Sequence, residues 1–179
     1  MKINFVQILN ICILSIFLLC SSCSTEKKIN ITKNITTEQF KTTAEKYGFE
    51  IAEDKTEGID EKYKRIILAT LNVRDNNPGC KIAFIITKDK ISAENIYSKT
   101  KNEIILKVKK DIKNKSNLYL KKEEKIFANG KKYKLKIEPN NMFFYIYCID
   151  DIILTVNLTE SIYENKVEKM LDELNILNI

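Results

Sequence analysis

The sequence predicts an α+β domain built on an antiparallel β-sheet of about six to seven strands that is covered by helices. Three observations predict this class. Runs of β-branched and aromatic residues are joined by short segments rich in turn formers, which is typical of hairpins and therefore of antiparallel pairing. Three segments carry apolar residues at helical spacing, before, between and after the strands. Several strands are apolar almost throughout, which indicates helices on both faces of the sheet.

The first helix is expected to begin after Thr36. Thr36 and Gln39 have the spacing of a capping box, in which each side chain bonds the backbone N–H of the other residue. Ile35 and Phe40 have the spacing of a hydrophobic staple, and Gly48 stands where a helix commonly ends in a left-handed turn. The stripe expected to be buried is Phe40, Ala44 and Tyr47.

Three strands are expected next, over residues 49–53, 65–73 and 80–88. The first, FEIAE, is a short candidate, whereas RIILATLNV and CKIAFIITK are rich in β-branched residues. The segment RDNNPG between the last two consists of turn formers, so these two strands are expected to form a hairpin.

A long helix is expected to follow, with Ser92 as its N-cap. Apolar residues recur at helical spacing and lysines occupy the other side, which is typical of a helix with one buried and one solvated face. Residues 113–124 are polar and are expected to form a connection without regular structure. The buried stripe is expected to contain Ile96, Tyr97, Thr100, Ile104, Val108 and Ile112.

Four further strands are expected to form a meander. KIFA and KKYKLKI flank Asn129 and Gly130, a pair that favours a two-residue hairpin turn because both residues tolerate positive φ. MFFYIYCI and IILTVNL, the last two strands, flank Asp150 and Asp151. Adjacent carboxylates are compatible with an acid/base pair, but between strands they are typical of turns, where they bond nearby backbone groups.

The last helix is expected to begin at Ser161, which has capping-box spacing to Glu164. The predicted order is therefore α-β-β-β-α-β-β-β-β-α, in a single domain over residues 35–179. This order is similar to that of the PsbP/Mog1-like fold, and such a resemblance of architecture implies no activity. The apolar stripe of the last helix is expected to contain Tyr163, Val167, Met170, Leu171, Leu174 and Leu177.

Residues 1–22 have the order of an export signal peptide. Lys2 is the charged residue at the start, an apolar run follows from residue 8 to residue 20, and Ser21 and Ser22 end the segment. The apolar run is shorter than the roughly 20 residues that a transmembrane helix needs. The segment is therefore expected to be removed from the mature protein.

The stretch Leu19-Cys20-Ser21-Ser22-Cys23 resembles the lipobox of bacterial lipoproteins. The resemblance implies that Cys23 becomes the first residue of the mature chain and carries the lipid that anchors it to the membrane. Cys20 occupies a position where that family usually has leucine. A redox CxxC pair or half of a zinc site is the alternative, but such motifs sit on folded domains and not beside export signals.

The expected location is the extracytoplasmic face of the cell membrane, with residues 23–34 as lipidated N-terminus and flexible tether. The chain resembles the small uncharacterised lipoproteins of low-GC bacteria. Its 30 Lys and Arg against 24 Asp and Glu predict either a lysine-rich solvated surface or attraction to anionic lipid or an anionic envelope polymer. An envelope protein is another candidate partner. Nucleic acid is not expected, because the basic stretches are interrupted by acids and lack interleaved aromatic residues.

Cys80 and Cys148 belong to the predicted domain. Each alternates with apolar residues of a strand, so both thiols are expected to face the core. Two alternatives follow from the residue types alone: a disulfide between them, or two buried free thiols that behave as small apolar groups.

No catalytic constellation is recognisable in the sequence. The chain has no histidine, which excludes ordinary catalytic triads and histidine-ligated metal sites, and its glycines are isolated, so phosphate-binding loops are missing. No cofactor or metal is expected. Phe143, Tyr145 and Tyr147 share one face of a strand, and either contact a ligand or partner or form core beneath a helix. A non-enzymatic binding or accessory domain is expected, and a cell-envelope hydrolase using carboxylate or tyrosine side chains is the alternative.

Overall fold

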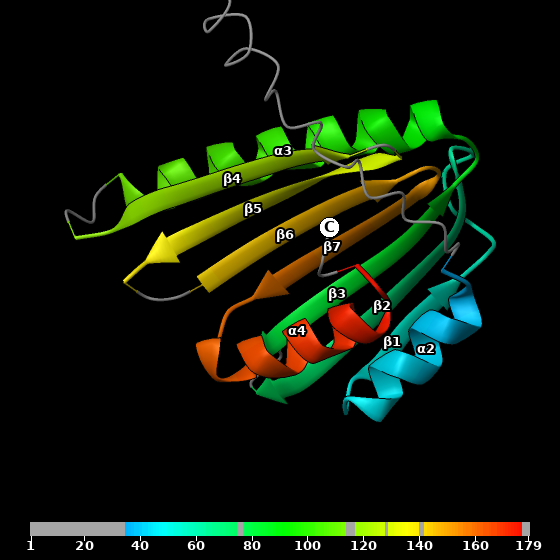
Figure 1. Cartoon of the computed structure of the whole chain (residues 1–179), viewed down its shortest axis with the longest axis horizontal. Helices are drawn as coiled ribbons and strands as arrows, with labels where there is room; N and C mark the ends of the chain where they lie inside the picture. Colours follow the sequence, from blue (N-terminus) through cyan, green and yellow to red (C-terminus); the bar gives the residue numbers. More distant parts are fainter. Residues whose placement is uncertain (1–34, 75–76, 114–116, 128, 140–141, 177–179) are drawn as a thin grey trace, which may run out of the picture.

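The computed structural model describes residues 35–176 apart from 75–76, 114–116, 128 and 140–141 (Figure 1). Over these residues the chain forms a seven-stranded antiparallel sheet with three α-helices packed on it, which confirms the predicted α+β class. The expected signal peptide, Cys23 and the tether lie outside the described residues. Within the described ranges, no helix is long and apolar enough to cross a membrane.

The elements follow the predicted order. The helices are α2 (Thr37–Lys46), α3 (Lys90–Ile112) and α4 (Glu164–Glu173), and the 3₁₀ turn η1 (Ser161–Tyr163) leads into α4. The strands are β1 (Glu50–Lys55), β2 (Tyr63–Arg74), β3 (Asn77–Thr87), β4 (Tyr119–Phe127), β5 (Gly130–Glu138), β6 (Met142–Ile149) and β7 (Ile152–Leu158).

The sheet consists of two meanders that meet where β3 pairs with β7. Its spatial order is β1-β2-β3-β7-β6-β5-β4, so the first and second meanders occupy opposite halves of the sheet. Helix α3 follows β3 and leads to β4 at the far edge, and it packs on one face of the sheet. Helices α2 and α4 pack on the other face, in front of β1, β2 and β3 in Figure 1. We call these two sides of the sheet the α3 face and the α4 face.

The α4 face holds the larger core. Apolar side chains of β2, β3, β6 and β7 pack there against α2 and α4. Phe40 of α2 stacks on Phe84 of β3 with 4.7 Å between the ring centroids, and both rings are fully buried. The expected stripe of α4 faces the core as far as the described residues extend: Val167, Met170, Leu171 and Leu174 are buried, and Tyr163 is partly buried.

The α3 face holds a smaller core beneath a single helix. Side chains of β5, β6 and β7 pack against the N-terminal half of α3, where Ala93, Ile96 and Tyr97 are buried. Farther along the helix Val108 is buried, whereas Ile104 and Ile112 are only partly buried. The predicted stripe of this helix therefore faces the sheet, but its C-terminal half is less tightly covered.

The first predicted helix cap is confirmed, and the second was predicted three residues too late, at Ser92 instead of Asp89. Thr36 Oγ1 accepts a hydrogen bond from the N–H of Gln39 at 3.2 Å, and Gln39 Oε1 accepts one from the N–H of Thr36 at 3.0 Å. Helix α3 begins at Lys90 and not after Ser92, because Asp89 caps it and accepts from the N–H of Ser92 at 2.7 Å. A carboxylate is favoured there, since it also meets the positive end of the helix dipole.

The capping box predicted for the last helix is wrong. Residues Ser161–Tyr163 form the turn η1, and α4 begins at Glu164 without a side-chain cap. The ring of Tyr163 lies so close to Gly79 that a Cβ at residue 79 would come within 2.7 Å of it. The ring of Tyr163 thus packs against β3 at the turn η1, which precedes the start of α4.

The polar connection predicted for residues 113–124 is also wrong, because β4 begins at Tyr119. An edge strand pairs on one side only and faces water with much of its surface, so it tolerates charged residues that hide its β pattern. The hairpin turn is displaced as well: Phe127 pairs with Gly130, which puts Gly130 in β5. A Cβ at Gly130 would collide with the carbonyl oxygen of Cys148, so glycine is required for this close strand approach.

The segment RDNNPG is a shorter connection than predicted. Arg74 ends β2, Asn77 begins β3, and the two residues pair across the hairpin. The remaining expected turn is confirmed, since Asp150 and Asp151 join β6 to β7 and Asp150 has a φ of 49°.

Candidate functional site

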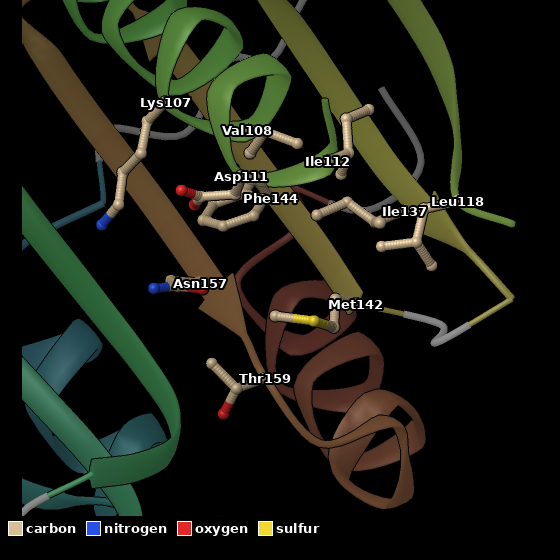
Figure 2. A pocket seen from close by; sticks show the side chains of 10 residues that line it. All are labelled: Lys107, Val108, Asp111, Ile112, Leu118, Ile137, Met142, Phe144, Asn157 and Thr159. Atoms are coloured by element: carbon tan, nitrogen blue, oxygen red, sulfur yellow. The ribbon is translucent and has the colours of Figure 1, made fainter. Parts of the chain in front are cut away.

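A hollow of about 500 Å³ lies between the C-terminal half of α3 and the sheet (Figure 2). Helix α3 provides one wall, and β5, β6 and β7 provide the floor. The residues that line it are Lys107, Val108, Asp111, Ile112, Leu118, Ile137, Met142, Phe144, Asn157 and Thr159.

Strand alternation and register bring the floor residues together. Met142 and Phe144 alternate with buried Phe143 on β6, so they face α3 while Phe143 faces α4. The pairing of β5 with β6 places Ile137 opposite Met142, and the pairing of β6 with β7 places Asn157 opposite Phe144. Three strands thus contribute to one surface that no single stretch of sequence contains.

The helical wall follows from the same kind of spacing. Val108 and Ile112 are four residues apart and therefore lie one above the other on the side of α3 that faces the sheet. Lys107 and Asp111 repeat this spacing one position earlier and are exposed at the rim. The wall therefore has an apolar lower part and a charged upper edge.

The polar and apolar groups are segregated in the hollow. Figure 2 shows Lys107, Asp111, Asn157 and Thr159 along one side and Ile112, Leu118, Ile137 and Met142 along the other. The amide oxygen Oδ1 of Asn157 is buried and accepts no hydrogen bond from the described residues. The hydroxyl of Thr159 donates to the carbonyl oxygen of Gly79 at 3.1 Å.

This arrangement suits binding better than catalysis. Lys107 and Asp111 are the ionisable side chains that line the hollow, and both project from the exposed side of α3. A general acid and base must converge on one reacting atom within hydrogen-bond reach, and these lining residues provide no such pair beside a nucleophile. The hollow can instead enclose an apolar group and bond a polar one.

The predicted aromatic row lies on the other face of the sheet. The side chains of Phe143, Tyr145 and Tyr147 are at most 2% exposed, and consecutive rings stack with centroids 6.1 and 6.2 Å apart. Burial raises the pKa of both tyrosines, and neither hydroxyl has a hydrogen-bond partner among the described residues. Their position is that of core residues, and a ligand would not reach them in this conformation.

Cys80 and Cys148 face the core, but on opposite sides of the sheet. Cys80 belongs to the core of the α4 face and Cys148 to that of the α3 face, and both thiols are free. The sheet separates them, so the disulfide alternative does not fit this fold. Burial raises the pKa of Cys80 to about 12 and that of Cys148 to about 11.

The acidic pair Asp150 and Asp151 has a structural position at the turn between β6 and β7. The carbonyl oxygen of Asp151 accepts hydrogen bonds from both the N–H and the hydroxyl of Thr87, each at 2.8 Å. Asn129 Nδ2 donates to Asp150 Oδ2 at 3.4 Å. The turn thereby ties the β6–β7 hairpin to the end of β3 and to the β4–β5 hairpin.

Sequence reasoning did not find the hollow. Asn157 was an available signal, because it is an amide side chain on the α3 face of a largely apolar strand. Within the described residues, no group of three or more His, Cys, Asp or Glu side chains could hold a metal ion. No protein-family model, curated protein or solved structure matches the chain.

Proposed function

We propose that this protein is a membrane-anchored, extracytoplasmic lipoprotein whose domain binds a ligand without chemical turnover. The observation that carries the binding proposal is the hollow beneath α3, with its apolar side and its polar side. Its volume of about 500 Å³ lies within the roughly 300–1,000 Å³ that is usual for small-molecule sites.

The segregated lining indicates the chemistry of the ligand. Six apolar side chains favour an aliphatic or aromatic body, which they would remove from water. The unpartnered Oδ1 of Asn157 favours a hydrogen-bond donor on the ligand, because a buried acceptor without a partner costs free energy. A peptide side chain or a small amphipathic molecule has both features.

Membrane attachment is proposed from the lipobox resemblance at Cys23. Two or three acyl chains hold a protein on a bilayer stably, since each buried methylene contributes about 0.8 kcal/mol. Residues 23–34 have a maximum reach of about 40 Å if fully extended, which would let the domain bind away from the bilayer surface.

The rival proposal, a hydrolase using tyrosine or carboxylate side chains, has less support. Tyr145 and Tyr147 are the tyrosines that lack hydrogen-bond partners on the α4 face, and both are buried. Because burial raises their pKa above the ordinary value, both hydroxyls stay protonated at neutral pH and are poor bases.

A fluorescent anilinonaphthalene sulfonate dye tests the binding hollow, since it combines an apolar body with a polar group. The dye is expected to bind the full chain in a non-ionic detergent with increased fluorescence. Met142→Trp, which puts a larger side chain among the lining residues, is expected to weaken this binding by about tenfold. Ile91→Trp adds the same ring at a site that is 73% exposed and lies at the opposite end of α3 from the lining residues. Equal weakening in both variants would contradict the proposal.

Intact-mass measurement of protein extracted from membranes tests the anchor. The mature chain is expected to begin at Cys23 and to carry the mass of attached acyl chains. Cys23→Ala should abolish both fatty-acid labelling and partition into detergent. A variant that still labels would refute lipidation at this residue without affecting the proposal for the hollow.

A further inference from the structure

A second hollow, of about 610 Å³, lies on the α4 face over β4 and β5, where the helices do not cover the sheet. It is a trough with charged walls, lined by Lys121, Lys122, Glu123, Lys134, Lys136 and Glu138. It is thus separate from the hollow beneath α3, which lies on the opposite face.

Strand alternation lines up three lysines of β5 along and beside this trough. Lys132, Lys134 and Lys136 alternate with buried residues of β5, so they all face the α4 side. Register places Lys125 of β4 opposite Lys132, Glu123 opposite Lys134 and Lys121 opposite Lys136. Alternate residues of a strand are about 7 Å apart, so β5 presents an unbroken row of ammonium groups at this repeat, whereas the adjacent row on β4 has a carboxylate between its two lysines. We call the five lysines of these two strands the lysine rows.

The aromatic row of β6 supports the lysines of β5. The Nζ atom of Lys132 lies 5.4 Å from the ring centroid of Tyr147, and that of Lys134 lies 4.8 Å from that of Phe143 and 5.0 Å from that of Tyr145. The ammonium groups of these lysines thus lie against the aromatic row at the side that borders β5, where the rings favour a nearby cation.

Part of this positive charge is not neutralised. Glu138 pairs with both Lys121 and Lys136 at 3.0 Å, and Glu123 pairs with Lys125 at 3.4 Å, whereas Lys132 and Lys134 form no ion pair within the described residues. Burial lowers the pKa of Lys132, the neighbouring charges of Lys125 and Lys134 lower it further, and the carboxylates of Glu123 and Glu168 oppose this change. An anion placed between these ammonium groups would relieve both their desolvation and their mutual repulsion.

Acidic side chains limit where an anion fits. Glu123 and Glu138 line the trough beside its lysines, and the charge of Glu164 at the start of α4 interacts with those of Lys134 and Lys136. A bound anion is therefore favoured along the lysines of β5 and disfavoured on either side of them. A narrow strip between carboxylates suits a chain of anionic groups better than the flat surface of a bilayer.

We propose that the lysine rows bind a linear polyanion whose successive charges are phosphate groups. A chain lying along β5 would meet Lys132, Lys134 and Lys136 in turn, with Lys121 and Lys125 along its other side. A single phosphate would reach only one or two of these ammonium groups, so affinity should depend on the length of the chain. Binding at this site requires neither the hollow beneath α3 nor a lipid on Cys23.

Titration of the full chain in non-ionic detergent with long-chain inorganic polyphosphate tests the proposal. Lys132→Met/Lys134→Met keeps most of the apolar stems over the rings and removes two charges, and it is expected to weaken binding by about tenfold or more, or ~1.4 kcal/mol. Lys109→Met/Lys110→Met removes the same charge from the exposed side of α3 and is expected to bind as the wild type does. Lys132→Arg/Lys134→Arg should retain binding.

Two further binding measurements distinguish a phosphate polymer from inorganic phosphate and from a phospholipid surface. Inorganic phosphate alone is expected to bind at least tenfold more weakly than the polymer, and added salt should weaken polymer binding steeply. Equal losses in the two methionine variants would overturn the proposal, because binding would then follow net charge alone. A preference for phosphatidylglycerol over phosphatidylcholine vesicles, without binding of polyphosphate, would overturn it in favour of a lipid surface. Circular dichroism shows whether each variant is folded. If Lys132→Met/Lys134→Met is unfolded, the binding of polyphosphate by Lys132→Arg/Lys134→Arg and by Lys134→Met tests the proposal instead.

Discussion

The two faces of the sheet differ in how their apolar side chains are covered. Seven strands spaced about 4.8 Å apart make a sheet roughly 29 Å wide, whereas one helix with its side chains is only about 10 Å across. On the α4 face, α2 and α4 pack against side chains of β2, β3, β6 and β7, and lysines of β5 lie beside the rings of β6. On the α3 face, a single helix of 23 residues covers the centre.

This difference explains why a hollow lies beside the helical cover on each face and why these two hollows differ in chemistry. Under the end of α3 the sheet supplies apolar side chains, so the uncovered part is an apolar hollow with a polar side. Beyond α4 the sheet supplies lysines, so the uncovered part is a charged trough. Incomplete helical cover on a wide sheet therefore leaves sites whose chemistry is set by the strands. The predictions below probe this comparison, beginning with the largest effect.

Removal of a ring from the core of the α4 face should have the largest effect. Phe84 is fully buried and stacks on Phe40, so Phe84→Ala is expected to lower the free energy of unfolding by about 3–5 kcal/mol, measured by urea denaturation. Ile126→Ala is the control on an edge strand, since this side chain is 82% exposed, and it should stay within about 0.5 kcal/mol of the wild type. A similar loss in both variants would show that the ring is not part of a tightly packed core.

A pair of tyrosines compares hydrogen bonding on the two faces. Tyr97 on the α3 face donates to Glu124 Oε1 at 2.9 Å, whereas the hydroxyl of Tyr147 on the α4 face has no partner among the described residues. Tyr97→Phe is therefore expected to cost about 1.5 kcal/mol in urea denaturation, because a bond to a charged acceptor is lost. Tyr147→Phe should be neutral or stabilising. A cost above about 1 kcal/mol for Tyr147→Phe would mean that its hydroxyl is hydrogen-bonded in solution.

The ion pairs at the edge of the trough should make stability depend on pH. Hydrogen bonds from Tyr119, then from Lys136 and Lys121, lower the pKa of Glu138 to about 2, from 4.5. Because the folded pKa is the lower one, this carboxylate stabilises the fold fully above pH 4.5 and loses its contribution as the pH falls towards 2. Glu138→Gln is expected to reduce the slope of the free energy of unfolding against pH in that range. Tyr119→Phe should reduce it partly, and an unchanged slope in both variants would contradict the assignment.

The smallest effect is expected from reductant. Cys80 and Cys148 are free thiols on opposite faces, so dithiothreitol should change the free energy of unfolding by less than about 0.5 kcal/mol. Both thiols should also resist iodoacetamide in the native protein, since burial raises the pKa of each and leaves little thiolate near neutral pH. Mass spectrometry before and after denaturation checks this, and a large drop in stability on reduction would contradict the separation of the two cysteines.

Local patterns in the sequence determined most of the elements. The capping box at Thr36 and Gln39 formed as predicted, because both of its hydrogen bonds join residues three positions apart. The apolar run from Met142 to Ile149 became β6 with the predicted bounds, and the alternation within it correctly assigned Phe143, Tyr145 and Tyr147 to one face. Such patterns depend on near neighbours, so they are readable without knowledge of the fold.

Only the tertiary structure decided which distant segments meet. The charged segment around Lys122 became the edge strand β4 because β5 pairs with it, and the two cysteines, each correctly expected to face the core, were separated by the sheet. The hollow beneath α3 unites Val108, Phe144 and Asn157 from a helix and two strands. The physical reason is that strand register and helix placement depend on the total apolar area buried across the sheet, a sum over distant residues that periodicity within one segment does not contain.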